Sequence, residues 1–167
     1  ISNLKHGAWQ QSGLKAGSMP INFGLGQVLR GKTLGIWGYG KTGQLLAGYG
    51  KAFGMQVQIW GSDESRVRAV KDGYLAATSR ESFFENADVL SLHLRLNEAT
   101  QGIVTADDLG RMKPTALFVN TSRAELLEPN ALIGALIVTG ARVSSLTSLA
   151  GIASTVTPDG MGAGRLY

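Results

Sequence analysis

A glycine-rich turn between a short apolar run and a helical pattern is the feature that most restricts how this chain can fold. The apolar run covers residues 33–37, and apolar residues recur at helical spacing from Lys41 to Phe53. In a GxGxxG turn, the first glycine permits a tight turn, the second lets the backbone approach a diphosphate, and the third lets helix and strand pack closely. The helix start also offers free amides to phosphates. We therefore expect a phosphate-binding turn, with a structural turn lacking a ligand as the alternative, at Gly38, Gly40, Lys41, Thr42 and Gly43.

The alternation of strand and helix patterns continues along the chain. Apolar runs predict further strands at residues 55–60, 74–77, 88–94, 115–120 and 141–146. Helices are predicted at 65–72, after capping-box patterns at Thr78–Glu81 and Thr105–Asp108, and from Glu128 to about residue 136 with Pro129 in the first turn. Such alternation is typical of a parallel sheet covered on both faces. We predict an α/β protein with a Rossmann-type, doubly wound parallel sheet and helices on both faces.

Composition divides the chain into three parts. Residues 1–30 have weak periodicity and many small residues, which indicates a lead-in or inter-domain segment. Residues 31–146 carry the strand and helix patterns and form the predicted dinucleotide-binding domain. Residues 147–167 are rich in Ser, Thr and Gly, so we expect an atypical, partly disordered tail.

Cysteine content and charge exclude several classes of function. The sequence has no cysteine, which excludes thiolate metal sites and cysteine nucleophiles, and we expect no metal. The net charge is +4, but Lys and Arg are scattered and not interleaved with aromatic residues, which argues against nucleic-acid binding. The longest apolar stretch is too short to span a bilayer, and the first residues do not resemble a signal peptide. We expect a soluble, cytoplasmic protein with neither nucleic acid nor membrane as a partner.

The end of the second predicted strand bears on which dinucleotide would bind. In NAD sites an acidic residue about 20 positions beyond the turn holds the ribose hydroxyls. Here the strand ends in Trp60-Gly61-Ser62, and Asp63, Glu64 and Arg66 follow. Ser62 and Arg66 would accept the 2′-phosphate of NADP, whereas Asp63 would reach back for the ribose of NAD. A third interpretation is that Asp63 and Glu64 only begin a helix. We expect NAD or NADP, with a slight preference for NADP.

Several further motifs follow one another between residues 29 and 136. They are residues 29–36 before the glycine turn, 53–57, 91–94, and 112–114 followed by 118–123. In this order and spacing they resemble the D-isomer-specific 2-hydroxyacid dehydrogenase family. The resemblance implies an NAD(P)-dependent oxidoreductase that transfers a hydride between a nicotinamide cofactor and a 2-hydroxy or 2-keto acid. Family members pair through this domain, so the resemblance also implies a homodimer.

The resemblance implies roles for residues beyond the glycine turn. Arg123 matches the arginine that binds the substrate carboxylate and polarises its carbonyl, a task that suits a planar guanidinium. Asn120, Thr121 and Ser122 match the strand end beside the nicotinamide. His93 matches a residue that lines the cofactor crevice. Trp60, Gly61, Ser62 and Arg66 complete the expected cofactor contacts.

The last part of the chain departs from the family pattern. Ser144, which we include among the cofactor-binding residues, stands where the family has an aspartate. The family completes its catalytic site with a glutamate and a histidine; here no Asp or Glu occurs between residues 137 and 158, and Asp159 takes the place of the histidine. A carboxylate with an ordinary pKa of about 3.9 is a poor proton donor at neutral pH. The alternative to an active oxidoreductase is therefore a catalytically incomplete dinucleotide-binding module without the substrate domain.

Overall fold

The computed structural model of the chain describes residues 28–134 and 142–146. The elements are, in chain order, β1 (Thr33–Trp37), α3 (Lys41–Ala52), β2 (Gln56–Trp60), α4 (Asp63–Lys71), β3 (Leu75–Ala76), α5 (Arg80–Asn86), β4 (Val89–Leu92), α6 (Ala106–Gly110), β5 (Leu117–Asn120), the 3-10 helix η1 (Ala124–Leu126) and β6 (Arg142–Leu146). In these ranges no helix combines the length and the apolar character needed to cross a lipid bilayer.

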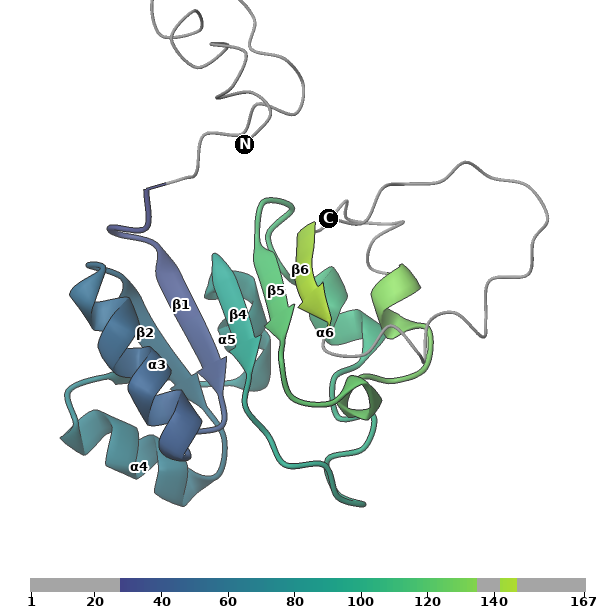
Figure 1. Ribbon diagram of the computed structural model, residues 1–167, viewed down its shortest axis with the longest axis horizontal. Coiled ribbons are helices and arrows are strands. Elements are labelled where there is room, and N and C mark those ends of the chain that lie inside the picture. Colours follow the sequence, from purple (N-terminus) through teal and green to yellow (C-terminus); the bar gives the residue numbers. More distant parts are fainter. Residues whose placement is uncertain (1–27, 135–141, 147–167) are drawn as a thin grey trace, which may run out of the picture.

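All the strands belong to one parallel sheet, with the order β3-β2-β1-β4-β5-β6 (Figure 1). The chain moves outward from β1 to β3 and then returns to β4, which pairs with β1 on its other side. This strand order is that of the Rossmann fold, so the predicted fold is confirmed. In such sheets a ligand binds at the carboxyl ends of the strands where the order reverses, which here is between β1 and β4.

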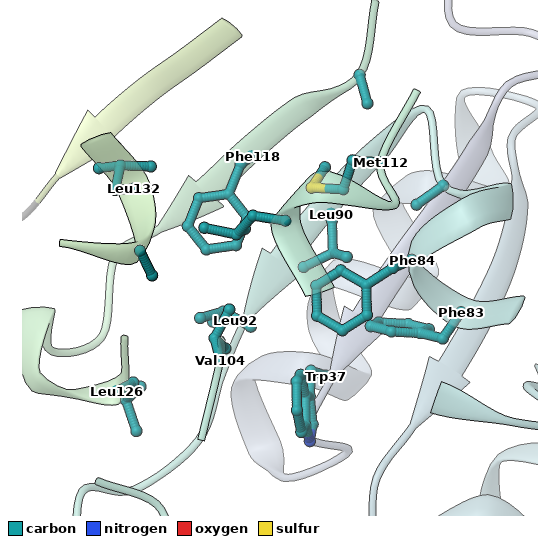
Figure 2. Close-up of a cluster of buried hydrophobic side chains, with 14 of the residues drawn as sticks. Trp37, Phe83, Phe84, Leu90, Leu92, Val104, Met112, Phe118, Leu126 and Leu132 are labelled. Atoms are coloured by element: carbon teal, nitrogen blue, oxygen red, sulfur yellow. The ribbon is translucent and has the colours of Figure 1, made fainter. Parts of the chain in front are cut away.

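Each face of the sheet carries its own apolar core. Successive side chains of a strand point to opposite faces. Leu34 and Ile36 of β1 pack with residues of α3 and α4, whereas Trp37 packs with residues of α5 and α6. The core that contains Trp37 is rich in aromatic rings: the ring centroid of Phe84 lies 5.8 Å from that of Trp37 and 5.5 Å from that of Phe83 (Figure 2). Burial on both faces explains the continuous apolar runs of the strands.

The capping patterns place one helix start correctly and another one residue too early. At α6, Thr105 accepts a hydrogen bond from the backbone N–H of Asp108, and the Asp108 carboxylate accepts one from the N–H of Thr105, as predicted. The box predicted at Thr78–Glu81 is wrong. Ser79 caps α5 and exchanges the two bonds with Ser82, while the Thr78 hydroxyl contacts the hydroxyl of Ser82. The sequence pattern favoured Thr78, because Glu81 stands three residues after it, whereas a serine stands three residues after Ser79.

Several predicted elements differ in extent; for example, the helix predicted at 65–72 is observed at Asp63–Lys71, and the strand predicted at 115–120 is observed at Leu117–Asn120. Two further differences have a clear structural cause. The strand predicted at 88–94 is observed at Val89–Leu92, because its partner β1 ends at Trp37, opposite Leu92. The helix predicted to contain Pro129 in its first turn begins at residue 131 instead. Asn130, with a φ of 65°, forms the turn before it, so Pro129 precedes the helix. Residues 135 and 136 of that prediction lie outside the described ranges.

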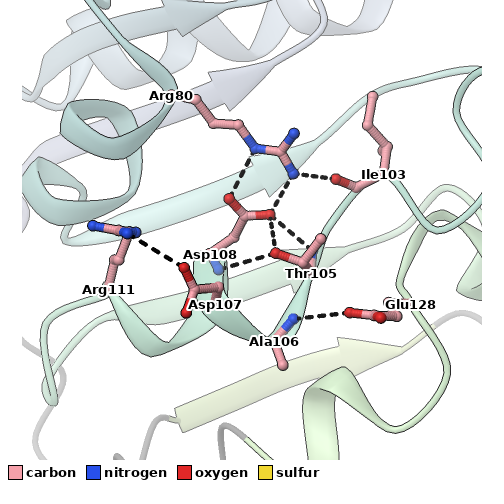
Figure 3. Close-up of polar contacts among 8 residues, drawn as sticks. All are labelled: Arg80, Ile103, Thr105, Ala106, Asp107, Asp108, Arg111 and Glu128. Atoms are coloured by element: carbon pink, nitrogen blue, oxygen red, sulfur yellow. Dashed lines mark hydrogen bonds and ion pairs between the residues drawn. The ribbon is translucent and has the colours of Figure 1, made fainter.

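A buried carboxylate ties α5 to the start of α6 (Figure 3). Asp108 is 6% exposed, and the Nε of Arg80 donates to its Oδ1 over 2.8 Å. The same guanidinium donates to the other carboxylate oxygen and to the carbonyl of Ile103, and it lies 5.2 Å from the ring centroid of Trp37. Burial alone would raise the pKa of Asp108, but the bonds from Arg80 and Thr105 hold that pKa below its ordinary value.

Candidate functional site

The glycine turn directly follows β1 and requires glycine at two positions for steric reasons. Gly38 has a φ of 105°, and a Cβ atom there would lie 2.6 Å from the carbonyl oxygen of His93. A Cβ atom at Gly43 would lie 2.1 Å from the carbonyl oxygen of Gly38, so glycine is what lets α3 pack so closely. Gly40 differs, because a Cβ atom there would meet no protein atom within 4 Å. The open space beside Gly40 is where a diphosphate could approach the backbone.

Helix α3 begins at this open space without a side-chain cap. Gly40 is its N-cap residue, and its first turn holds no acidic residue. By contrast, the hydroxyls of Ser62, Ser79 and Thr105 cap α4, α5 and α6. The first amides of a helix lack intrahelical partners and carry the positive end of the helix dipole. The start of α3 is therefore suited to an anion, as the sequence predicts.

A cleft of about 590 Å³ lies over the carboxyl ends of β1, β4 and β5. Its volume is within the range of about 300–1,000 Å³ that is usual for small-molecule sites. The cleft is lined by Gly40, Lys41, Thr42, Gly43, His93, Leu94, Arg95, Thr121 and Ser122. It brings residues of the glycine turn together with His93, Thr121 and Ser122, and their contact with a cofactor stays a prediction. Sequence reasoning did not include Leu94 and Arg95 among the site residues, because a leucine and an exposed arginine after a strand form no distinctive pattern.

His93 lies half-buried in the lining of this cleft. Its backbone N–H donates to the carbonyl oxygen of Trp37 over 2.8 Å, and its ring Nε2 lies 2.9 Å from the hydroxyl oxygen of the buried Ser91. Burial lowers the pKa of His93 below its ordinary value of 6.5. The imidazole is therefore neutral at pH 7 and offers a ligand hydrogen bonding rather than charge.

The turn after β5 is held by a buried amide side chain. Asn120 is 2% exposed, and its Oδ1 accepts a hydrogen bond from the N–H of Ser122 over 3.0 Å. Its Nδ2 donates to the carbonyl oxygen of Arg123 over 2.8 Å. The Ser122 hydroxyl donates to the carbonyl oxygen of Leu92, at the end of β4, over 3.0 Å. These bonds fix the backbone from which Thr121 and Arg123 project.

Arg123 lines a second hollow, of about 410 Å³, next to the cleft. The two hollows share Leu94, Arg95 and Ser122. Arg123 is exposed, and its guanidinium donates to the neighbouring carbonyl oxygen of Ser122 over 2.9 Å. Within the described ranges it forms no ion pair. This guanidinium is therefore accessible to a carboxylate.

The end of β2 lies beside the glycine turn. The carbonyl oxygen of Trp60 accepts a hydrogen bond from the N–H of Gly38 over 2.9 Å. Ser62 caps α4, and the acidic residues after it occupy the first helical turn. Arg66 is ion-paired with Asp63, and its guanidinium lies 4.9 Å from the ring centroid of Trp60. Neither hollow is lined by the predicted residues Trp60, Gly61, Ser62 and Arg66.

Two predicted site residues belong to the last part of the chain. Ser144 lies within β6, which pairs with β5 in the sheet. Asp159, in the place of the family's histidine, falls outside the described residues. Of the two predicted catalytic residues, the structure therefore describes only Arg123, and the role of Asp159 stays a prediction.

Comparisons with known proteins agree with the fold. Residues 2–142 match the family profile of the D-isomer specific 2-hydroxyacid dehydrogenase, NAD binding domain. A crystal structure of a candidate D-3-phosphoglycerate dehydrogenase from Ralstonia solanacearum is 58% identical, with a TM-score of 0.72 over 89% of this chain and 45% of that chain. A phosphoglycerate oxidoreductase from Vibrio cholerae O395 is 47% identical, with a TM-score of 0.70 over 85% of this chain and 48% of that chain.

Curated relatives include enzymes that are named for a different acid. A glyoxylate reductase from Thermococcus litoralis is 38% identical over 133 residues, which are 80% of this chain and 39% of the relative. A glyoxylate reductase from Aeropyrum pernix is also 38% identical over 133 residues, 80% of this chain and 38% of the relative. The chain therefore spans about two fifths of the length of these relatives.

Proposed function

Because the chain belongs to the D-isomer-specific 2-hydroxyacid dehydrogenase family, we propose that it binds a nicotinamide dinucleotide in the cleft at the ends of β1, β4 and β5. The observation that carries this proposal is the uncapped start of α3, which opens onto free space beside Gly40. The diphosphate would accept hydrogen bonds from the first amides of α3. The nicotinamide would extend toward Thr121 and Ser122, and His93 would contact the cofactor in its neutral form.

The reaction we propose is hydride transfer between the nicotinamide and the C2 carbon of a 2-hydroxy or 2-keto acid. The cofactor supplies or accepts the hydride when it is bound. Arg123 would hold the acid's carboxylate through two parallel hydrogen bonds and polarise the neighbouring carbonyl. Relatives named glyoxylate reductase, hydroxypyruvate reductase and D-3-phosphoglycerate dehydrogenase support this substrate class.

For the 167-residue polypeptide on its own, we favour cofactor binding with little turnover. Reduction of a 2-keto acid requires a proton donor beside the carbonyl oxygen. Asp159 stands where the family has its histidine, and a carboxylate with an ordinary pKa of about 3.9 is deprotonated at neutral pH. The chain would thus supply the cofactor site and the carboxylate-binding arginine of a dehydrogenase without an efficient acid.

Replacing Gly40 with alanine tests the position of the diphosphate. The φ of Gly40 is −84° and its Cβ position is free of protein atoms, so the fold should persist while the methyl group enters the proposed phosphate space. We expect the dissociation constant of NADPH, from fluorescence titration, to rise about tenfold or more.

Gly48→Ala is the matched control, because this exposed α3 glycine also has free space around its Cβ position. It should stabilise α3 by about 0.5–1 kcal/mol and leave NADPH affinity unchanged. Unchanged affinity in Gly40→Ala would place the diphosphate elsewhere.

The proposed preference for NADP rests on Arg66. A 2′-phosphate would compete with Asp63 for the guanidinium that lies over Trp60. We expect Arg66→Ala to weaken NADPH about tenfold, the value of one charge-assisted hydrogen bond, and to change NADH affinity less than about twofold. Asp63→Asn should have the opposite effect, because it removes the competing carboxylate. An equal loss of both cofactors in Arg66→Ala would mean that Arg66 only supports the end of β2, and the NADP preference would be wrong.

A further inference from the structure

The charged residues that line the cleft and the neighbouring hollow are all positive. Lys41 and Arg95 line the cleft, Arg95 and Arg123 line the hollow, and no Asp or Glu is part of either lining. His93 adds no charge at pH 7, because burial lowers its pKa. Lys41 begins α3 beside the proposed diphosphate. Arg95 and Arg123 are therefore the two cations left for the substrate.

Arg95 also lacks the acidic partner that most arginines of the domain have. In the described part of the chain, Arg66, Arg68, Arg80 and Arg111 are paired with carboxylates. Arg95 and Arg123 are both exposed and have no such pair in these ranges. Two like charges that line one hollow repel each other, and an anion placed between them removes that repulsion.

The backbone that carries Arg95 is held in place by a local turn. The carbonyl oxygen of Arg95 accepts the hydroxyl of Thr100 over 2.6 Å. The Oδ1 of Asn97 accepts the backbone N–H groups of Ala99 and Thr100, each over 3.0 Å. The segment after β4 therefore presents Arg95 from an ordered turn, and Arg123 projects from the turn that Asn120 holds after β5.

We propose that Arg95 binds a second anionic group of the substrate, a carboxylate or a phosphate attached beyond C2, while Arg123 holds the C1 carboxylate. This inference rests on the proposed function, since it names which 2-hydroxy acids the site prefers. A substrate with a single carboxylate engages Arg123 and leaves Arg95 without an anion. A second anionic group adds one charge-assisted hydrogen bond and relieves the repulsion between the two arginines.

The test compares hydroxy acids that differ by one anionic group. D-glycerate is paired with 3-phospho-D-glycerate, and D-lactate with D-malate. The full chain is saturated with NADPH, which cannot accept a hydride, so calorimetric titration measures binding without reaction. We expect the dianionic member of at least one pair to bind about tenfold more tightly. Arg95→Gln should reduce that ratio to about one and leave D-glycerate affinity within about twofold, whereas Arg123→Gln should weaken every ligand.

Arg30→Gln is the matched control, because Arg30 is exposed, lies before the amino end of β1 and has no ion pair in the described ranges. It should leave the ratio unchanged. Preference for both dianions supports a general anion subsite, and preference for 3-phospho-D-glycerate alone supports a phosphate subsite. The inference would be overturned by equal affinities for the two acids within both pairs, or by the same loss of preference in Arg30→Gln as in Arg95→Gln. If NADPH still binds in that case, the proposed cofactor site stands. NADPH binding without binding of any hydroxy acid overturns the substrate assignment as well. Failure to bind NADPH or NADH would refute the proposed function itself.

Discussion

At the scale of single residues, the buried Tyr39 stabilises the glycine turn. Its side chain is 2% exposed, and its hydroxyl donates to Oδ2 of Asp72 over 2.7 Å. Its carbonyl oxygen accepts a hydrogen bond from the Arg68 guanidinium over 3.1 Å. Burial, followed by the hydrogen bond to Asp72, raises the pKa of Tyr39, so the phenol stays protonated as a donor. The phenol therefore supports the fold, while Gly38 and Gly43 determine the shape of the turn.

Tyr39→Phe should separate these two contributions. It removes one hydrogen bond but keeps the buried ring, and the exposed Asp72 carboxylate can be solvated instead. We expect the free energy of unfolding in urea to fall by about 0.5–1.5 kcal/mol and the NADPH dissociation constant to change less than about twofold. Tyr49→Phe, at a residue that is 60% exposed, is the control and should change neither quantity measurably. A large loss of affinity with unchanged stability would show that the phenol shapes the binding turn.

At the scale of elements, the bridge between Arg80 and Asp108 makes stability depend on pH. The folded-state pKa of Asp108 lies below its ordinary value of 3.8, so the unfolded chain binds protons more readily in acid. The stabilisation is complete above the ordinary pKa and is lost as the pH falls through the lower folded value. Asp108→Asn should cost about 1–3 kcal/mol at pH 7, less than a fully buried pair would, because Arg80 is 34% exposed.

Urea unfolding of the wild-type chain and Asp108→Asn at a series of pH values measures this effect. The difference in unfolding free energy between the two should shrink as the pH falls below about 3.8, where the unfolded carboxyl takes up a proton, and should level off once the folded carboxyl is neutral as well. Asp107→Asn is the control, because that carboxylate is 86% exposed and pairs with Arg111 on the helix surface. A difference that stays constant with pH would mean that Asp108 acts through its shape and not through its charge.

Local sequence patterns predicted the elements of this fold better than the contacts between them. The strand and helix order followed from apolar periodicity, and the Thr105–Asp108 cap followed from a spacing of three residues. The bond between Arg80 and Asp108 joins residues 28 positions apart, and no local pattern encodes it. The end of β4 at Leu92 likewise depends on where its partner β1 stops.

In the candidate site, too, local patterns were predictable and the contacts between distant residues were not. The glycine turn was predictable because backbone geometry demands glycine at fixed spacing, and Arg123 was found through the family resemblance. Arg95 was missed because an exposed arginine in a loop has no distinctive spacing. Arg95 and Arg123 line the same hollow because β4 and β5 pair in the sheet, and this pairing is not encoded locally in the sequence.

At the scale of the whole molecule, the cleft lies where the two halves of the sheet meet. One half, β1 to β3, supplies the glycine turn, and the other, β4 to β6, supplies His93 and the turn that carries Arg123. A ligand that contacts both halves binds the folded chain and not the unfolded one. Cofactor binding should therefore stabilise the domain as a unit. The homodimer and the cytoplasmic location stay predictions.

The last prediction follows from this linkage and from the departure at Asp159. NADPH at about 100 times its dissociation constant should add about 2.7 kcal/mol to stability, which raises the melting temperature by roughly 5–10 °C in a domain of this size. Gly40→Ala should show a smaller shift at the same NADPH concentration. The same preparation should consume NADPH slowly or not at all with glyoxylate, pyruvate or hydroxypyruvate, because Asp159 stands where the family has its histidine and a carboxylate of ordinary pKa is a poor proton donor. A thermal shift together with rapid turnover would refute the incomplete-site interpretation and require another acid. Turnover lost in Asp159→Asn would identify that residue as the acid, with a pKa raised far above its ordinary value.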